Sequence, residues 1–423
     1  MTDYPRIFRV RQHFDTPRVD DVAAEVNNQL AARGLDATVK PGERVAITAG
    51  SRGIANIEVI IKAAVGFFKG LGAEPFIVPA MGSHGGGTAE GQQKVIESYG
   101  VTEAFCGCPI LASMETVEVC QTEQGFPVHF DRHAFEADHV LVCNRIKPHT
   151  NFVGDIESGL MKMMLIGLGK HAGAILYHQA IIKYSFGQIV RSVAREVIEK
   201  CRIVAGLAIV ENCEDETAKI EVVAPGDFES REKELLVLAK QWMPRLPFTD
   251  ADVLVIDEMG KNIAGTGMDT NVIGRKYSES HSTDKDLAQI CRIVVRGLTA
   301  QTHGNAAGVG IADFCKTSLV DQMDKEATWV NCLTAVHPSG GRIPIHYPTD
   351  REILDRVLPT IGLTPPADAR LQWIRNTLDL VEVECSEAYL QEAESREDLE
   401  VLSELRELPL DDEGNLSSCH VTS

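Results

Sequence analysis

Residues 44–79, RVAITAGSRGIANIEVIIKAAVGFFKGLGAEPFIVP, give the clearest indication of the fold class. The stretch begins with a short apolar run, Arg44–Thr48, that is typical of a buried strand. Apolar residues then recur at helical spacing over Ile57–Leu71, and this pattern stops at Gly72. A second short apolar run follows over Glu74–Pro79. A strand, a helix and another strand in this order predict a parallel α/β sheet.

The same alternation extends outward from this stretch along most of the chain. It predicts helices over Thr88–Tyr99 and His178–Lys200 and strands over His139–Cys143, Ile203–Val210, Asp252–Asp257, Arg292–Gly297 and Gly308–Phe314. Pro244–Pro247 interrupts the pattern, and 423 residues exceed what one hydrophobic core usually serves. We therefore expect two α/β domains with a cleft between them, over residues 1–248 and 249–385, with a mostly parallel sheet in the first.

The last part of the chain is acidic. A helical pattern over about 386–410 predicts a C-terminal helix that can pack back on the first domain. Residues after Asp411 are expected to form a frayed tail.

Composition excludes several classes of partner. The formal net charge of −20 argues against nucleic-acid and anionic-membrane partners, because both require a basic surface. No window approaches the roughly 18 apolar residues of a membrane span, and the N-terminal residues do not resemble a signal peptide. Eleven Cys occur without a repeated metal-binding spacing, and the close pair Cys106 and Cys108 lacks a second pair. We expect a cytoplasmic protein with reduced thiols.

Three loops that directly follow predicted strands contain candidate functional groups. They are Ala49–Gly53 with Arg52, Gly82–Gly87 with His84, and Asn144–Phe152 with His149. In an open parallel sheet, ligands bind beyond the carboxyl ends of the strands. The glycines around His84 leave the backbone accessible, but they match neither a GxGxxG fingerprint nor a Walker A loop. The alternatives are a tight turn with a solvated Arg, a flexible loop with an exposed His, and a His that only caps a backbone group.

Two further residues follow on the third loop. Lys162 lies in an almost uncharged stretch, Leu160–Leu168, where burial can lower the pKa of an amine and make it reactive. Alternatively, it is a half-buried helical Lys whose ammonium reaches solvent. His178 is expected at the start of the predicted helix and could be structural or a ligand.

Together these residues resemble a known family. Members of the nickel-pincer-nucleotide-dependent lactate racemase family carry a strand-turn motif ending in Thr-Arg-Pro, a Gly-Thr-His loop, a further His, a Ser-Gly-Gly segment with a Lys, and a second His at a fixed distance. This chain is similar in order, with Arg52, His84, His149, Ser158-Gly159, Lys162 and His178. Lys162 and His178 are sixteen residues apart, which is the most specific part of the match. The runs Asp257–Ile263 and Gly265–Asn271 also resemble this group.

The resemblance implies an isomerase, a racemase or epimerase, that inverts the C2 carbinol of a 2-hydroxy acid by reversible hydride transfer. The implied cofactor is a nickel-pincer nucleotide, held covalently through a thioamide on Lys162, with His178 as the protein ligand to nickel. His84 and His149 are implied as the paired acid/base catalysts. The cofactor performs the redox chemistry, and the protein orients the substrate and supplies protons.

The resemblance also implies a substrate-binding pair. Arg52 is expected to bind the substrate carboxylate, for which its planar fork is suited. A Lys of the second domain shares this task in the family, and Lys316 is the candidate. Departures from the family pattern lie at this end of the site, at Ala49 and Gly53, so the implied substrate is a 2-hydroxy acid rather than lactate in particular.

The implied partners are a small-molecule substrate, the proteins that make the cofactor, and in one reading a second copy of the chain. Protein expressed without those biosynthetic enzymes is expected to lack cofactor. Three alternatives stay open: an NAD-dependent hydroxyacid dehydrogenase, a non-catalytic metal- or nucleotide-binding protein, and an epimerase of sugar acids that shares the mechanism.

Overall fold

The structure is a computed structural model that describes residues 4–51, 53–150, 153–180, 183–276, 282, 286–334, 337–417 and 419. The chain forms two compact units. The N-terminal unit comprises residues 15–148 and 154–243, and the C-terminal unit comprises residues 1–14, 149–153 and 244–423. The division at Pro244 falls in the predicted proline-flanked segment. Residues 1–14 and 386–410, which we expected with the first domain, belong to the C-terminal unit.

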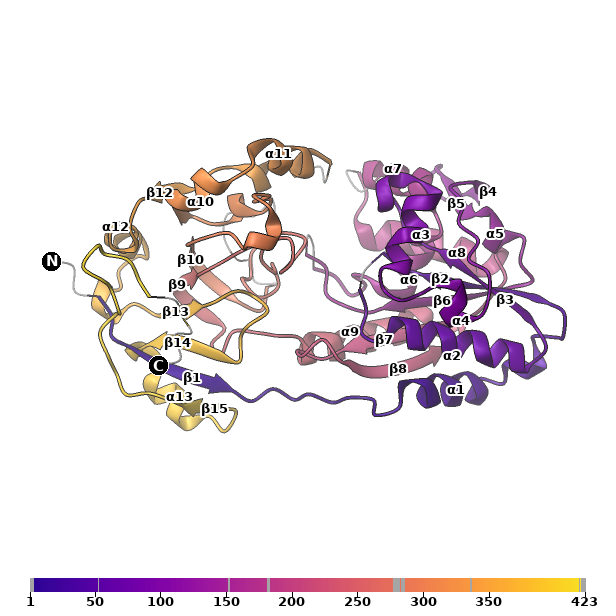
Figure 1. The fold of residues 1–423 in the computed structure, drawn as a ribbon, viewed down its shortest axis with the longest axis horizontal. Coiled ribbons are helices and arrows are strands. Elements are labelled where there is room, and N and C mark those ends of the chain that lie inside the picture. Colours follow the sequence, from indigo (N-terminus) through magenta and orange to yellow (C-terminus); the bar gives the residue numbers. More distant parts are fainter. Residues whose placement is uncertain are drawn as a thin grey trace. The chain divides into compact units, whose positions relative to one another are not determined.

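The N-terminal unit contains a five-stranded sheet in the order β3-β2-β6-β7-β8 (Figure 1). Neighbouring strands from β3 to β7 are parallel, and β8 runs antiparallel to β7, as the predicted mostly parallel sheet requires. Strand bounds in this unit are β2 (Arg44–Ala49), β3 (Glu74–Pro79), β6 (His139–Arg145), β7 (Ile203–Glu211) and β8 (Thr217–Val223), with a separate hairpin of β4 (Thr116–Gln121) and β5 (Pro127–Asp131).

Helices connect and cover these strands. Their bounds are α1 (Val22–Ala32), α2 (Ile57–Gly70), α3 (Ala89–Glu97), α4 (Glu103–Cys106), α5 (Arg132–Phe135), α6 (Gly159–Lys162), α7 (Lys170–Ala180), α8 (Phe186–Lys200) and α9 (Phe228–Trp242). One core cluster joins α1 and α2 to one face of the sheet, where Val45, Ile47 and Leu141 alternate with residues of the other face. The helix over Ile57–Gly70 and the two flanking strands agree with the sequence pattern.

The helix predicted over His178–Lys200 is confirmed only from Phe186 to Lys200, as α8. His178 lies near the end of α7, not at the start of a helix, and α8 begins at Phe186. The reason is local: Ser185 and Gln188 form a reciprocal capping box that starts a new helix. Within the described residues, no helix is both long and apolar enough to cross a membrane.

The C-terminal unit contains an eight-stranded sheet in the order β12-β11-β10-β9-β13-β14-β1-β15 (Figure 1). The strands from β12 to β13 are parallel, and β14, β1 and β15 pair antiparallel. Strand bounds are β1 (Ile7–Gln12), β9 (Asp250–Ile256), β10 (Gln289–Val295), β11 (Phe314–Lys316), β12 (Ile345–Tyr347), β13 (Leu371–Ile374), β14 (Glu382–Ser386) and β15 (Leu399–Val401). The helices are α10 (Thr317–Gln322), α11 (Lys325–Thr334), α12 (Asp350–Val357) and α13 (Leu390–Ser395).

Alternate residues of β9 enter two different core clusters, one on each face of this sheet. Leu254 and Ile256 belong to one cluster, and Val253 and Val255 belong to the other. Burial on both faces explains why this strand reads as a continuous apolar run.

The strand predicted over Gly308–Phe314 is mostly wrong. A short 3-10 helix, Val309–Ile311, occupies this stretch, and β11 begins only at Phe314. Gly308 has φ +105, and a Cβ there would lie 1.8 Å from the carbonyl oxygen of Thr266. The backbone therefore turns at this glycine because another chain segment approaches it closely.

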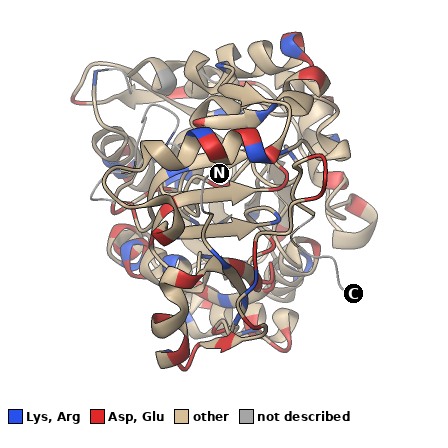
Figure 2. Cartoon of the chain, turned by 90° about the vertical axis from the view of Figure 1, so that its left-hand side faces the viewer, with Lys and Arg blue, Asp and Glu red and all other residues tan. Residues whose placement is uncertain are grey.

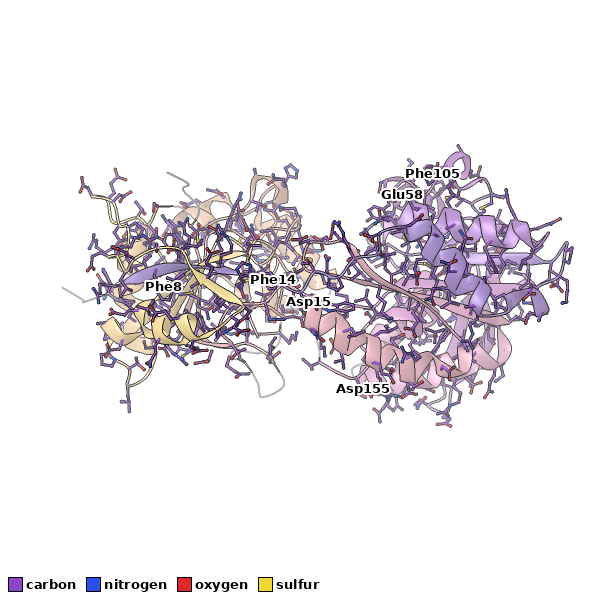
Figure 3. The ribbon with its side chains drawn as sticks, turned by 90° about the horizontal axis from the view of Figure 1, so that it is seen from below. Phe8, Phe14, Asp15, Glu58, Phe105 and Asp155 are labelled. Carbon is purple, nitrogen blue, oxygen red and sulfur yellow. The ribbon has the colours of Figure 1, made fainter. Side chains whose placement is uncertain are left out.

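The first strand of the chain completes the sheet of the C-terminal unit. Phe8, labelled on β1 in Figure 3, is fully buried in one of its core clusters. Arg9 and Arg11 stand opposite Glu384 and Glu382 in register, and each pair forms an ion pair. Figure 2 colours basic residues blue and acidic residues red, and the two colours are interspersed along the ribbon. Complementary cross-strand charges thus help to specify the pairing of β1 with β14.

The acidic stretch after β14 is not one helix. A 3-10 turn and the six-residue α13 are followed by β15, which pairs with β1. The helix ends where Arg396 adopts an extended backbone and pairs with Asp398. The predicted frayed tail is also wrong for the described residues, because Leu416 and Cys419 are buried and donate backbone hydrogen bonds to Asp350 and Asp257.

Candidate active site

Three loops leave the carboxyl edge of the sheet in the N-terminal unit. They follow Ala49 of β2, Pro79 of β3 and Arg145 of β6. Because β2 is parallel to both β3 and β6, all three loops start at the same edge. This is where ligands bind in open parallel sheets.

The segment that carries Lys162 packs against this edge. The Asn144 side chain, at the end of β6, donates to the carbonyl oxygen of Gly159 at 2.8 Å. A Cβ at Gly50 would lie 3.2 Å from Cε of Met163, and one at Gly82 would lie 2.8 Å from Cβ of Ala174. Both glycines therefore allow a close approach of the segment to the first two loops.

The helical segment has an unusual local geometry directly after Lys162. Residues 163–167 form one turn of π-helix between α6 and α7. Such turns occur frequently at functional sites. Lys162 itself is half-buried, and its Nζ lies 6.0 Å from the centroid of the Phe186 ring. No motif or charge in the sequence pointed to Phe186.

A buried carboxyl group lies behind α6. Glu232 of α9 accepts a hydrogen bond from the backbone N–H of Met161 at 3.0 Å, and burial raises its pKa to about 8. Gly159 has φ +78, and a Cβ there would lie 2.6 Å from Cδ of Glu232. Glu232 thus holds the turn that presents Lys162, and only glycine fits at its start.

Ser158 closes the third loop. Its Oγ accepts from the backbone N–H of Lys147 at 2.7 Å and donates to the carbonyl oxygen of Lys147 at 2.6 Å. Arg145 forms an ion pair with Glu211 of β7, which also accepts from the backbone N–H of Ala55. These contacts fix the base of the third loop.

His84 is exposed in the glycine-rich loop between β3 and α3. Gly85 follows it with φ +64, and a Cβ there would lie 2.3 Å from the carbonyl carbon of Gly91. A Cβ at Gly87 would lie 3.7 Å from the ring of His171, an exposed residue of α7. The loop therefore brings His84 to the region of α7, and His171 is an imidazole that the sequence analysis did not single out.

His149 belongs to the C-terminal unit, together with Thr150. Nζ of Lys276 donates to the carbonyl oxygen of His149 at 3.3 Å and to Oδ1 of Asn271 at 2.6 Å. Thr270 donates from its hydroxyl to the carbonyl oxygen of Thr150 at 2.6 Å. A buried cation thus lies beside one of the two acid/base candidates.

The sequence analysis missed Lys276. One signal could have found it: Lys276 lies five residues after Asn271, the last residue of the run Gly265–Asn271 that resembles the family. Lys316 was chosen instead, and the structure places it elsewhere in the same unit. Its Nζ donates to Oδ1 of Asn415 at 2.8 Å and lies 3.5 Å from Asp350. Its predicted role in substrate binding stays a prediction.

Arg52 and residues 151–152 lie outside the described residues. For His178 the structure describes the backbone, within α7, but not the side chain. Among the described residues, no three His, Cys, Asp or Glu side chains gather to hold a metal ion.

The chain was compared with known proteins. Residues 7–187 match the family model of the lactate racemase N-terminal domain. This range contains Arg52, His84, His149, Lys162 and His178. No curated protein matches the chain. Among solved structures, the lactate racemase apoprotein from Thermoanaerobacterium thermosaccharolyticum is 11% identical with a TM-score of 0.45, over 88% of this chain and 89% of that chain. A likeness this low carries no argument here.

Proposed function

We propose that the chain is an isomerase that inverts the C2 carbinol of a 2-hydroxy acid, because residues 7–187 match the family model of the lactate racemase N-terminal domain. The observation that carries the proposal, beside the match itself, is the packing of the Lys162 segment against the carboxyl edge. Met163 and Ala174 approach Gly50 and Gly82 there. The Lys162 amine, the glycine-rich loop over 82–87 and the His84 imidazole thus belong to the carboxyl edge of the same sheet.

The residues present fit a nickel-pincer nucleotide. Lys162 is a half-buried amine on a fixed turn and would hold the group through a thioamide. His178 would supply the protein ligand to nickel. When bound, the group supplies a hydride acceptor and donor, so that a carbanion at C2 is avoided.

The proton steps fall to the two imidazoles. As C2 loses hydride, a ring nitrogen of one His accepts the proton of the C2 hydroxyl, and a planar 2-keto acid results. When hydride returns to the other face, a ring nitrogen of the second His donates a proton to the oxygen. In the proposal, His84 serves one face of the substrate and His149 serves the other.

The substrate carboxylate requires a cation. Arg52 fills this role in the proposal because its planar fork suits a carboxylate. We add Lys276, because its Nζ lies 3.3 Å from the carbonyl oxygen of His149, one of the two proposed acid/base residues. Lactate, a longer 2-hydroxy acid and a sugar acid all share the recognised carboxylate and hydroxyl.

The test uses the full chain coexpressed with enzymes that make the cofactor. Intact-mass measurement is expected to detect an adduct that Lys162→Ala lacks. The loaded protein is then incubated with single enantiomers of 2-hydroxy acids and aldonic acids, and the products are separated by chiral chromatography. Interconversion of at least one pair is the expected result.

Two other results point to the alternatives. Absorbance of reduced NAD on addition of NAD and a hydroxy acid would identify a dehydrogenase. An adduct that persists in Lys162→Ala, or loaded protein without turnover of any acid tested, would contradict the proposal and favour a binding protein.

A further inference from the structure

A second group of polar side chains lies directly behind the His84 loop. Lys170, the first residue of α7, is fully buried, and its Nζ donates to the carbonyl oxygen of Pro79 at 2.7 Å and to Oε1 of Gln92 at 2.8 Å. Gln92 of α3 is equally buried and donates from Nε2 to the carbonyl oxygens of Met81 and Gly82 at 2.9 Å. Each hydrogen-bonding atom of the Gln92 side chain is thereby used.

Asp131 completes this group from the end of β5. Its Oδ2 lies 3.5 Å from Nζ of Lys170, and its Oδ1 accepts from the backbone N–H of Ala134 at 3.0 Å. Both side chains of the ion pair are at most 1% exposed. Burial raises the pKa of Asp131 and lowers the pKa of Lys170, while each partner favours the charge of the other. A buried ion pair of this kind is weak evidence for a gain in stability. Its contacts therefore point to a role in fixing the positions of the segments that Asp131 and Lys170 join.

The backbone at Lys170 supports this reading. Its φ is +55, in the left-handed region that a residue with a Cβ seldom adopts. The strained backbone turns the side chain back under the loop after β3, where it meets Pro79 and Gln92. Burial of the Lys170 ammonium and its unfavourable φ both cost free energy. Both features attach α7 to the loop after β3.

We propose that Gln92 and Lys170 are positioning residues that fix the His84 loop relative to the segment carrying Lys162. The loop root, residues 79–82, accepts three of the four hydrogen bonds that the two side chains donate, and the fourth joins Lys170 to Gln92. Lys170 follows Lys162 by eight residues along the same helical segment. Gln92 and Lys170 therefore join the proposed proton-transferring group to the proposed cofactor-bearing group. The inference rests on the proposed function of both.

The first experiment needs no cofactor. Amide hydrogen exchange is measured on wild type, Gln92→Met, Gln92→Glu and Lys170→Met. Gln92→Glu keeps an acceptor for Lys170 but removes the amide donor to Met81 and Gly82. All three variants are expected to increase exchange over residues 80–88 while α8 stays protected, because only the loop loses its anchors. The control is Gln93→Met, since Gln93 contacts Glu97 and not the loop.

The second experiment measures kinetics of cofactor-loaded protein. The adduct mass on Lys162 is expected in every variant, and kcat is expected to fall about 10-fold to 100-fold in Gln92→Met and Lys170→Met, since a displaced acid/base group loses its alignment. KM is expected to change by less than roughly threefold. Gln93→Met should match wild type in both constants.

The outcomes separate the proposals. Unchanged exchange over 80–88 in Gln92→Glu overturns the anchoring, whatever the activity. Increased exchange with unchanged kcat overturns the positioning role. If Gln92→Met exposes α8 as well, the variant has unfolded, and Gln92→Glu decides. If loaded wild type racemises nothing, the proposed function fails, while the exchange experiment still decides whether these side chains hold the loop.

Discussion

The carboxyl edges of the two sheets share a parallel topology and differ in what closes them. In the N-terminal unit, β2 and β3 run into glycine-rich loops, and His84 is exposed. In the C-terminal unit, charged residues stand at the ends of β9, β10 and β11: Asp257 pairs with Arg296, and Lys316 lies 3.5 Å from Asp350. Arg296 donates two hydrogen bonds to Asp350 at 3.0 Å and pairs with Asp257.

The C-terminal tail covers this second edge. Asp350 also accepts the backbone N–H of Leu416 at 2.8 Å, and Asp257 accepts that of Cys419 at 2.8 Å. The parallel strands of both units therefore end at an edge where a ligand could bind. In the C-terminal unit, side chains and the tail already form hydrogen bonds with the polar groups of that edge. Topology predicts where a site can lie, and the loops decide whether it is available.

The largest expected effect comes from removing the proposed acid/base groups. Removal of an acid/base group typically costs about 10²-fold to 10⁴-fold, so His84→Ala and His149→Ala should each lose racemisation by that factor. Single-turnover absorbance with each pure enantiomer is expected to show that each variant still oxidises one of them. Wild-type racemisation by both variants would assign the two imidazoles to structure.

The closed edge should respond in stability instead. Arg296→Met removes the cation that pairs with Asp257 and the nearer of two cations beside Asp350, where Lys316 remains at 3.5 Å. Breaking a buried pair costs about 3–5 kcal/mol. Urea unfolding followed by tryptophan fluorescence should report the loss, because Trp373 donates to Asp257 at 2.6 Å. The adduct on Lys162 should be unaffected. An unchanged midpoint would mean that the network contributes nothing to the fold.

Two lysines of the same unit sharpen the contrast. Lys276→Met should raise KM about 10-fold to 100-fold, since a charged hydrogen bond contributes about 1.5–3 kcal/mol. Lys316→Met is the matched control and should leave KM unchanged while lowering stability, because Lys316 binds Asn415. Steady-state kinetics on both variants decides. A KM effect confined to Lys316→Met would restore the original assignment.

The last prediction concerns the contribution of Glu232 to the pH dependence of stability. Its pKa of about 8 in the folded protein lies above the ordinary value of 4.5, so the folded state binds more protons between these values. Stability should therefore fall as pH rises from 4.5 to 8, by at most about 1.4 kcal/mol per pH unit. Glu232→Gln should flatten this dependence in urea unfolding at pH 5, 6.5 and 8. Parallel profiles would contradict a buried, protonated carboxyl.

Local pattern was sufficient for much of the fold. The elements over 44–79 were predicted because apolar spacing and Gly72 signal them without distant contacts. Errors arose where a distant partner or a cap overrode the pattern. The Ser185 capping box divided one predicted helix. The pairing of β15 with β1 replaces part of the helix predicted over about 386–410, because a partner strand hundreds of residues away outweighs helical propensity.

The site divides in the same way. The order of His84, His149, Lys162 and His178 could be read directly, because motifs are contiguous in the chain and loops after parallel strands share one edge. Lys276 could not be ranked above Lys316, since both are lysines beside polar residues and only folding brings one of them to His149.

The sequence alone determined the α/β class, the division near Pro244 and the candidate groups, since periodicity, proline placement and motif spacing are local properties. Only the tertiary structure decided that β1 belongs to the C-terminal unit, that the tail closes one edge, and that Gln92 and Lys170 lie beneath the His84 loop. These facts depend on side chains that meet from distant parts of the chain, where burial and hydrogen bonding, not local preference, select the partner.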